Sequence, residues 1–265
     1  MEKTITISLF NRVEYTKKVL EHLLRCHDVE NYAIFIFAEP ASLGVIDLAQ
    51  KFASVHSHLP RGTGATKVKI NDRRLGCSHN IYQCLHYAFE VAESKFNIHI
   101  EDDVVPARDF LQFHDWCNQT YIDDKDVFLS CGYQRTPPEE QHLSNKVKKH
   151  RWFNPWGWGT WKDRWDDNFG KELYRRINLP RYSSWDIHTN YLRGDRVQIM
   201  PVVARSQNIG AVGGLHVPSA AWHQKHQFNP NWIENTKEYQ SRFEETGEIV
   251  EGVWDEQVLK MLQQE

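Results

Sequence analysis

FNIHIEDDVVPARDFLQF, residues 96–113, is the stretch that decides the fold, because it joins the end of a strand to a run of carboxylates. Residues 97–100 (NIHI) alternate polar and apolar side chains, which predicts the end of a strand. Residues 101–103 (EDD) follow at once. Pro106 is suited to the first turn of the helix that we expect after them.

Glu101, Asp102 and Asp103 allow two interpretations. Adjacent carboxylates repel one another, and a cation placed among them relieves that repulsion. Mg²⁺ and Mn²⁺ are hard ions that bind carboxylate oxygens and complete their shells with water and substrate phosphates. The run therefore predicts a metal–diphosphate site. The alternative is a solvated acidic turn that caps the next helix.

Composition bounds the class of protein. The chain has 265 residues, of which 32 are Lys or Arg and 35 are Asp or Glu, and its formal charge is −3. This length supports one large α/β domain or two small ones. A near-neutral charge gives no electrostatic footprint for nucleic acid, and no apolar run is long enough to span a bilayer.

The cysteines and the N-terminal sequence indicate a reducing compartment. The number of cysteines is odd and no C-x-x-C pair occurs, so we expect reduced thiols, several of them buried. No signal-peptide pattern opens the sequence, which predicts a cytoplasmic protein. The five cysteines are Cys26, Cys77, Cys84, Cys117 and Cys131.

The first hundred residues alternate between strand and helix patterns, which predicts an α/β fold with a mostly parallel sheet and helices on both faces. The run at residues 32–38 (YAIFIFA) is almost entirely apolar, as in a strand buried on both faces. Strands are predicted at 4–10, 32–38, 67–70 and 97–100, with helices at 14–26, 43–52 and 77–91.

Polar residues follow each of these predicted strands. Asn11, Glu39 and Asn71 stand where the first three strands end, and residues 101–103 follow the fourth. Ligands of parallel α/β sheets bind at the carboxyl ends of the strands, so these side chains predict a ligand site. No G-x-G-x-x-G follows the first strand and no G-x-x-x-x-G-K-[ST] occurs, which argues against dinucleotide enzymes and P-loop NTPases.

The middle of the chain predicts a strand, a loop and an aromatic turn. A strand is expected at 127–131 and a mobile loop at 133–150, whose basic end (146–150) is a weaker candidate for holding phosphate. Residues 152–161 contain four tryptophans among glycines, which favours a wall for a sugar or an acceptor. The alternative for this stretch is a tightly packed aromatic turn. Residues 162–169 resemble a helix.

The last third of the chain contains one further candidate carboxylate. A helix is expected at 183–192, capped by Ser183 or Ser184, with Asp186 in its first turn. An acid at that place also complements the helix dipole, which is the structural alternative for Asp186. A strand is expected at 197–203 and a C-terminal helix at 253–263. Between them a Gly- and Ser-rich loop carries His216, His223 and His226 as a possible lid.

With these elements in place, the sequence resembles the GT-A glycosyltransferases, and most closely the inverting N-acetylglucosaminyltransferase I type and small bacterial and phage relatives. IEDDVVPARDFLQF is similar to that family's E-D-D and short helix, and NPWGWGTWKDRW to its glycine–aromatic turn. SSWDIHTNYL followed by PVVARSQNIG is similar to its W-D-D-W helix and later R-[ST]-x-x-F-G strand. The blocks occur in family order.

The resemblance implies roles for particular residues. Asp103 would bind Mn²⁺ (or Mg²⁺), with His216 as a further ligand and His223 as its runner-up. Asp186 matches the position of the general base. The implied contacts of a UDP-sugar donor are Asn11, Arg12, Glu39, Asn71, Arg73, Arg74, Glu101, Asp102, Trp158, Arg205, Ser206 and Asn208. Ile187 stands where the family has a second Asp, and the loop after Gly210 is longer in Gly than the family's.

We therefore expect a single GT-A domain, with a nucleotide-sugar half at 1–103 and an acceptor half at 104–265 that has flexible loops at about 133–150 and 206–230. The expected activity is metal-dependent, inverting transfer from a UDP-sugar to a hydroxyl of a glycan, lipid-linked or small-molecule acceptor. Golgi members of this fold carry an anchor and a stem, and the sequence shows neither, so we expect a bacterial or phage cytoplasmic enzyme. The alternatives are a sugar nucleotidyltransferase and a non-catalytic carbohydrate-binding protein. A zinc hydrolase is remote because no H-E-x-x-H occurs.

Overall fold

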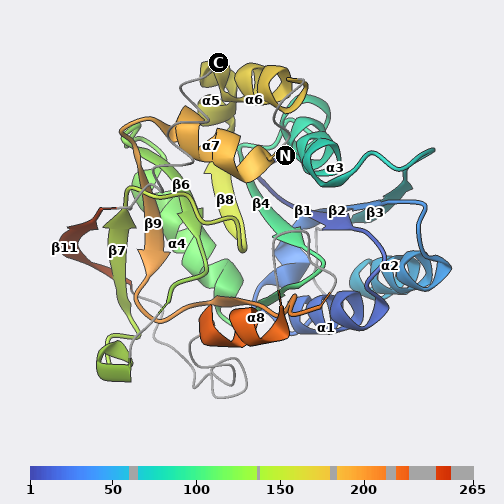
Figure 1. The fold of residues 1–265 in the computed structure, drawn as a ribbon, viewed down its shortest axis with the longest axis horizontal. Helices are drawn as coiled ribbons and strands as arrows, with labels where there is room; N and C mark the ends of the chain where they lie inside the picture. Colours follow the sequence, from blue (N-terminus) through green and yellow to red (C-terminus); the bar gives the residue numbers. More distant parts are fainter. Residues whose placement is uncertain (60–64, 136–137, 180–183, 213–218, 227–242, 252–265) are drawn as a thin grey trace.

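The computed structural model describes residues 1–59, 65–135, 138–179, 184–212, 219–226 and 243–251. Within them the chain forms a nine-stranded sheet in the order β11-β7-β9-β6-β8-β4-β1-β2-β3, and a separate two-stranded sheet of β5 and β10 (Figure 1). The strands are β1 (Lys3–Leu9), β2 (Ala33–Ala38), β3 (Thr66–Ile70), β4 (Phe96–Glu101), β5 (Val104–Pro106), β6 (Val127–Cys131), β7 (Lys146–His150), β8 (Trp158–Trp161), β9 (Val197–Pro201), β10 (Ser206–Asn208) and β11 (Glu244–Val250).

Helices connect these strands. The α-helices are α1 (Val13–Leu23), α2 (Leu43–His56), α3 (Cys77–His86), α4 (Phe110–Tyr121), α5 (Lys162–Arg164), α6 (Gly170–Ile177), α7 (Trp185–Arg193) and α8 (Ala220–His226). The predicted helix at 77–91 ends in a π-helical turn, Tyr87–Val91, and a second such turn, Trp165–Phe169, follows α5. The helix expected at 253–263 lies outside the described residues.

The N-terminal half of the sheet is parallel, as the alternating pattern predicted. β1 pairs with β2 on one side and with β4 on the other, so Thr6 lies between Phe35 and His99. From β1 the chain proceeds outward through β2 and β3 and then returns to add β4 on the opposite side of β1. The carboxyl ends of β1 and β4 therefore flank the point where the strand order reverses, which is the usual ligand position in such sheets.

The C-terminal half of the sheet is mixed, and here two predictions were wrong. Residues 146–150, expected in a mobile loop, form β7, which pairs with β9 and β11. Residues 158–161, expected in an aromatic turn, form β8, which lies antiparallel between β4 and β6. Both are short strands whose pairing partners are distant in sequence, so local composition did not reveal them.

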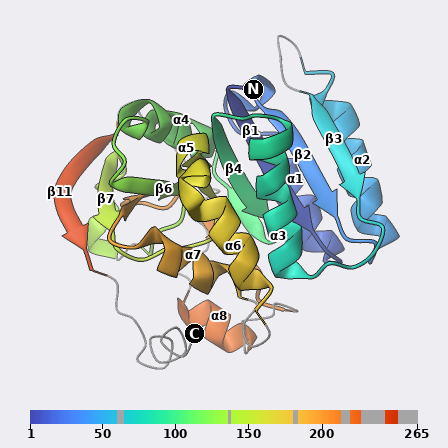
Figure 2. The same ribbon diagram turned by 90° about the horizontal axis from the view of Figure 1, so that it is seen from above.

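Helices cover both faces of the sheet. In Figures 1 and 2, α3, α6 and α7 lie on one side of the strands, and α1 and α2 lie on the other. The predicted burial of β2 on both faces is confirmed, because Ile34 and Ile36 pack into the cluster with α1 and α2, and Phe35 and Phe37 pack with Cys84 of α3. The structure thus confirms the α/β fold class.

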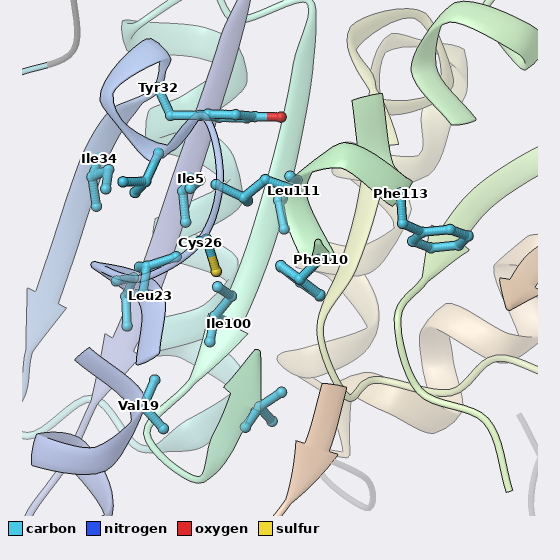
Figure 3. Close-up of a cluster of buried hydrophobic side chains, with 14 of the residues drawn as sticks. Ile5, Val19, Leu23, Cys26, Tyr32, Ile34, Ile100, Phe110, Leu111 and Phe113 are labelled. Carbon is cyan, nitrogen blue, oxygen red and sulfur yellow. The ribbon is translucent and has the colours of Figure 1, made fainter. Parts of the chain in front are cut away.

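The apolar core that supports the acidic turn lies under α1 and α4. Figure 3 shows Val19 and Leu23 of α1 in one cluster with Ile100 of β4 and Phe110 of α4. All four side chains are buried. Burial of this kind stabilises each side chain by about 1.5–3 kcal/mol, so the strand that leads into the carboxylates is firmly held.

The segment after the carboxylates differs from its prediction. Pro106 does not open a helix but ends β5, which pairs antiparallel with β10, and α4 begins only at Phe110. The β-branched Val104 and Val105 suit a strand, and their partner is a segment about a hundred residues further along. This pairing places Asn208 opposite Val104 and so brings the C-terminal segment beside Asp103.

The cysteines agree with their prediction. All five cysteines are free thiols, and every one except Cys77 is buried, as predicted. Among the residues that the structure describes, no helix is both long enough and apolar enough to cross a membrane.

Candidate functional site

The polar residues that follow the first strands are found at the carboxyl edge of the sheet, as predicted. Asn11 follows β1 and is exposed, whereas Glu39 and Asn71 follow β2 and β3 and are buried. Glu39 accepts backbone hydrogen bonds from Leu75 at 2.9 and 3.0 Å and from Gly76 at 2.9 Å. Its carboxylate therefore holds the turn that leads into α3, where Gly76 adopts φ +82°.

Asn71 has a similar internal role. Its amide nitrogen donates to Asn80 at 3.0 Å, and its carbonyl oxygen accepts from Gln83 at 2.7 Å. Asn80 in turn donates to the carbonyl oxygen of Phe37 at 3.3 Å. Asn71 and Glu39 thus fix α3 against the end of the sheet, and in this structure their side chains shape the edge of the site from beneath.

Glu39→Gln tests this reading of the turn. A Gln side chain offers one acceptor oxygen and an NH₂ group, which faces the N–H of Leu75 or Gly76. Loss of a charged acceptor from a buried site costs about 1.5–3 kcal/mol, so the free energy of unfolding should fall by that amount in urea titrations. Asp47→Asn, at an exposed acid on α2, should change it by less than about 0.5 kcal/mol. Equal stability of the two variants would contradict the assigned role.

Asp102 and Asp103 lie in the turn after β4 and are both nearly buried. Arg12, which follows β1, bridges them. Its Nη1 lies 2.9 Å from Asp103 Oδ2, its Nε donates to Asp102 Oδ2 at 3.4 Å, and its Nη2 donates to Asp102 Oδ1. Burial alone would lower the pKa of Arg12, but the two carboxylates outweigh it and raise that pKa. The guanidinium is thus the cation that relieves the repulsion expected from this acidic run.

The segment after β10 closes over this ion pair. Asn208 lies opposite Val104, the residue after Asp103, and the backbone N–H of Ile209 donates to the Asp103 carbonyl oxygen at 2.8 Å. Gly210 lies so close that a Cβ added there would overlap Asp103 Oδ2 and would come within 3.1 Å of Arg12 Nη1. A residue with no side chain is therefore required at position 210.

Gly210→Ala should accordingly disturb the ion pair. The new methyl group must displace either the Asp103 carboxylate or the 208–212 segment, and overpacking of this kind costs about 1–3 kcal/mol. We expect a lower free energy of unfolding and weaker ligand binding at the acidic turn. Gly194→Ala is the comparison variant: a side chain is strained at its φ of +63°, so stability should fall there too, but ligand binding at the acidic turn should not change. If Gly210→Ala leaves both stability and binding unchanged, the close approach is unimportant.

Glu101, at the end of β4, faces a different set of groups. Its Oε2 lies 4.0 Å from Sγ of Cys77, the first residue of α3. Burial raises the pKa of Glu101 well above its ordinary value, and the charges of Asp103, Asp102 and Asp186 add to the effect. Partial burial and the charges of Glu101 and Asp186 likewise raise the pKa of the Cys77 thiol. Glu101 and Cys77 therefore favour their neutral forms.

Asp186 is the candidate base, and α7 brings it close enough to influence Glu101 and Cys77. It stands in the first turn of α7, whose N-cap residue is Ser184. The predicted cap has an unexpected form, because the Ser184 hydroxyl donates to Asp186 Oδ1 and makes no hydrogen bond to the helix backbone. The serine thus orients the carboxylate instead of closing the helix. Ser183, the other candidate, lies outside the described residues.

Arg73 and Arg74 are exposed in the turn after β3. The Arg74 guanidinium carbon lies 4.5 Å from the centre of the Phe10 ring, next to Asn11. Both residues lie at the carboxyl edge of the sheet. Within the described part of the chain neither of them forms an ion pair, so both stay candidates for contact with a nucleotide.

Among the predicted donor contacts that are buried, three have side chains that the structure does not present to a ligand. Trp158 is fully buried in β8, where it stacks on Trp185 with ring centres 5.8 Å apart. Arg205 is fully buried and pairs with Asp109 at 2.9 Å. Ser206 donates to the carbonyl oxygen of Trp156 at 2.6 Å. The prediction of direct donor contact is therefore corrected for these residues, because each is committed to the core or to the backbone.

The aromatic stretch belongs mainly to the core for the same reason. Trp161 is buried, and its indole nitrogen donates to Asn118 at 2.7 Å. Trp152 and Trp156 are half-buried, and Trp156 packs against Tyr133 with ring centres 4.5 Å apart. Trp158 and Trp161 are thus packed in the core, as in the alternative interpretation, but in a strand and not in a turn. A sugar wall remains a proposal for Trp152 and Trp156 alone.

Of the two candidate histidine ligands, the structure describes only His223. His216 lies outside the described residues. His223, on α8, has its Nε2 3.0 Å from the Asn208 carbonyl oxygen and 3.2 Å from Asn208 Oδ1. Ile209, the next residue, donates its backbone N–H to Asp103, so His223 is linked to the acidic turn through the segment that contains Asn208. The two contacts with Asn208 connect α8 to the site.

The carboxylates of Asp102 and Asp103 have the right donor atoms for a divalent cation, but in this structure their arrangement leaves no place for one. Their oxygens are the hard donors that Mn²⁺ and Mg²⁺ prefer. However, the Arg12 guanidinium bridges Asp102 and Asp103, and the Gly210 backbone lies against Asp103 Oδ2. Within the described part of the chain, no three His, Cys, Asp or Glu side chains are placed to hold a metal ion together. In this structure the Arg12 guanidinium occupies the place beside Asp102 and Asp103 where a metal ion would bind.

Several residues of the site were not predicted. Cys77 beside Glu101, Tyr15 beneath Arg12, and Gly210 over Asp103 had no assigned role. A glycine two residues after Asn208 offered a weak signal, since close backbone approach is a common reason for glycine in a loop. Cys77 offered none, because only the fold brings the start of α3 beside the end of β4.

Comparison with known proteins bears on the fold alone. No protein-family model matches the sequence, and no curated protein sequence matches it. Among solved structures, the mannosyltransferase PcManGT from Pyrobaculum calidifontis in complex with GDP-Man and Mn²⁺ is similar at a TM-score of 0.51 and 16% identity, over 77% of this chain and 56% of that one. TarS residues 1–349 from S. aureus is similar at a TM-score of 0.52 and 12% identity, over 78% of this chain and 60% of that one.

The chain thus spans less than two thirds of each of these two neighbours. At such low identity the likeness concerns architecture only. That architecture is the large, mostly parallel sheet flanked by helices that the chain itself shows, with its reversal of strand order between β1 and β4. The chain has the GT-A fold of these glycosyltransferase structures.

Proposed function

We propose that the protein is a glycosyltransferase that moves a sugar from a nucleotide sugar to a hydroxyl group of an acceptor. The observation that supports the proposal is that α7 packs against the end of β4, where Trp185 lies edge-on to His99 with ring centres 6.3 Å apart, and that the charge of its neighbour Asp186 helps to raise the pKa of Glu101, beside the point where the strand order reverses. A nucleotide would lie along the carboxyl ends of β1 to β4, in the half formed by residues 1–103. The acceptor would approach from the half formed by residues 104–265.

Asp186 is the proposed general base. An acceptor hydroxyl is a poor nucleophile until a carboxylate takes its proton as the new bond forms, and such assistance contributes about 10²–10⁴-fold to the rate. The hydrogen bond from Ser184 holds the carboxylate in one orientation. Attack on the anomeric carbon from the side opposite the leaving diphosphate is a single displacement, which inverts the anomeric centre.

The donor side of the proposal rests on Asn11, Arg73, Arg74 and the carboxylates. Asn11, Arg73 and Arg74 are exposed at the edge of the sheet where the nucleotide would lie. A divalent cation and UDP as the carrier nucleotide are part of the proposal. When bound, such an ion would neutralise the negative charge of the diphosphate leaving group. The structure of PcManGT holds GDP-Man and Mn²⁺, which makes GDP a carrier to be tested beside UDP.

Calorimetric titration distinguishes this function from its two rivals. We expect binding of UDP or GDP that strengthens in the presence of Mn²⁺ and does not require a glycan. A carbohydrate-binding protein would bind oligosaccharides without nucleotide or metal. A sugar nucleotidyltransferase would form a nucleotide sugar and pyrophosphate from UTP and a sugar 1-phosphate. Failure to bind either diphosphate, with or without Mn²⁺, would overturn the proposed function.

A further inference from the structure

Arg12 is the only charged partner that the described residues supply at short range to Asp102 and Asp103. Its guanidinium donates hydrogen bonds to Asp102 from Nε and Nη2, and its Nη1 lies 2.9 Å from Asp103 Oδ2. The exposed fractions of the three side chains are 20%, 6% and 11% for Arg12, Asp102 and Asp103. A planar fork that joins two buried carboxylates is a specific arrangement, which a lysine cannot reproduce.

The surroundings hold Arg12 in this position. Its guanidinium carbon lies 5.5 Å from the centre of the Tyr15 ring, one turn along α1. The Tyr15 hydroxyl accepts a hydrogen bond from the backbone N–H of Val212 at 3.2 Å. Gly210 packs against Asp103 Oδ2 and Arg12 Nη1 from the same segment. The segment 208–212, Tyr15 and Arg12 therefore form one connected unit around the carboxylates.

A divalent ion and the guanidinium cannot share Asp103 Oδ2 in this arrangement. Metal–oxygen distances for Mg²⁺ are about 2.0–2.1 Å, so the ion would lie within a few ångström of Arg12 Nη1. Two cations at that separation in a partly buried site repel strongly. The backbone at Gly210 also lies against this oxygen. Entry of an ion at Asp103 Oδ2 therefore requires Arg12 to move.

We propose that Arg12 is an internal counter-cation that holds the Asp102 and Asp103 carboxylates in place. A divalent ion can bind Asp103 only after it has displaced the Arg12 guanidinium from it. Arg12 is then a positioning residue that sets the affinity of the site for metal. Because Val212 is bonded to Tyr15, displacement of Arg12 also alters the contact between α1 and the 208–212 segment. The inference rests on the proposed function only for the identity of the ion.

The first test measures Mn²⁺ binding without nucleotide, by electron paramagnetic resonance of the free ion. Arg12→Gln should bind Mn²⁺ at least about tenfold more tightly than the wild type. Arg12→Lys keeps a charge but loses the fork, and it should show a smaller gain. Lys17→Gln is the matched control, because it removes one exposed charge from the same helix, and it should match the wild type. Unchanged or weaker Mn²⁺ binding by Arg12→Gln overturns the proposal.

A second readout follows Arg12 directly in the wild type. The NMR resonance of the Arg12 Nε–H group is assigned by its loss in Arg12→Lys. Its chemical shift should change when diamagnetic Mg²⁺ is added. An unchanged signal at saturating Mg²⁺ overturns displacement. Circular dichroism reports whether each variant folds, and if Arg12→Gln does not fold, the Mg²⁺ titration of the wild type and the Arg12→Lys affinity decide. Nucleotide binding by the wild type is measured separately, so failure of the proposed function and failure of this inference give different results.

Discussion

Asp186→Asn should lower the turnover of nucleotide sugar by about 10²–10⁴-fold and leave donor binding within about threefold of the wild type. An amide has nearly the shape of a carboxylate but cannot accept the proton of the acceptor hydroxyl, and general-base assistance is worth that factor. Arg12 pairs with Asp102 and Asp103 and not with Asp186, so the substitution should leave the donor side of the site intact. Turnover and calorimetric binding are measured on the same preparation.

Ser184→Ala is the companion variant for this prediction. Because the Ser184 hydroxyl donates to Asp186 Oδ1, its removal should reduce turnover by less than Asp186→Asn does and should not change donor binding. Normal turnover in Asp186→Asn would return Asp186 to the role of a helix N-terminal acid that complements the dipole. Loss of donor binding as severe as the loss of turnover would show that Asp186 serves the donor, and the assignment of a base would be wrong.

Asp103→Ala should abolish the metal-dependent part of nucleotide-sugar binding. The side chain is nearly buried and pairs with Arg12, so its removal takes away the proposed ligand and leaves the guanidinium with Asp102 alone. Breaking a buried ion pair on one side typically costs about 3–5 kcal/mol, and the retained pair with Asp102 should keep the loss of stability below that range. Calorimetry with Mn²⁺ and with a chelator measures the binding, and urea titration measures the free energy of unfolding.

Asp72→Ala supplies the control for that variant. Asp72 is an exposed acid in the turn after β3, at the same edge of the sheet, so its removal changes the net charge equally without touching Arg12. Its donor binding should stay within about threefold of the wild type. If Asp103→Ala and Asp72→Ala bind the donor with the same metal dependence, Asp103 is not a metal ligand and the acidic turn has only its structural role with Arg12.

The parallel half of the sheet was predictable because its signals are local. Each strand from β1 to β4 is an apolar or alternating run that ends in a polar residue, and a helical pattern follows the first three. The sequence therefore indicated the edge of the sheet at which Asn11, Glu39, Asn71 and the acidic turn lie. The hydrogen bonds of Glu39 and Asn71 were not predictable, because Leu75 and Asn80 reach them only through the turn into α3.

The remaining errors share a physical origin in non-local contacts. β5 exists because β10 pairs with it, and Trp158 is buried because β8 lies between β4 and β6. A run of tryptophans and glycines is equally compatible with a sugar wall and with a strand in a core, so only the pairing decides. The partnership of Arg12 with Asp102 and Asp103 likewise joins two strand ends that are neighbours in the sheet but about ninety residues apart in the chain.

The most direct test of the central claim is release of nucleoside diphosphate from a panel of UDP- and GDP-sugars by the wild type, with Mn²⁺ or with a chelator, and with glycan and simple hydroxyl acceptors. We expect Mn²⁺-dependent release of one diphosphate from a small number of the sugars. The release should be lost in Asp186→Asn while the donor still binds. No release of either diphosphate with any donor, together with no binding of UDP or GDP, would show that the protein is not a glycosyltransferase of this kind.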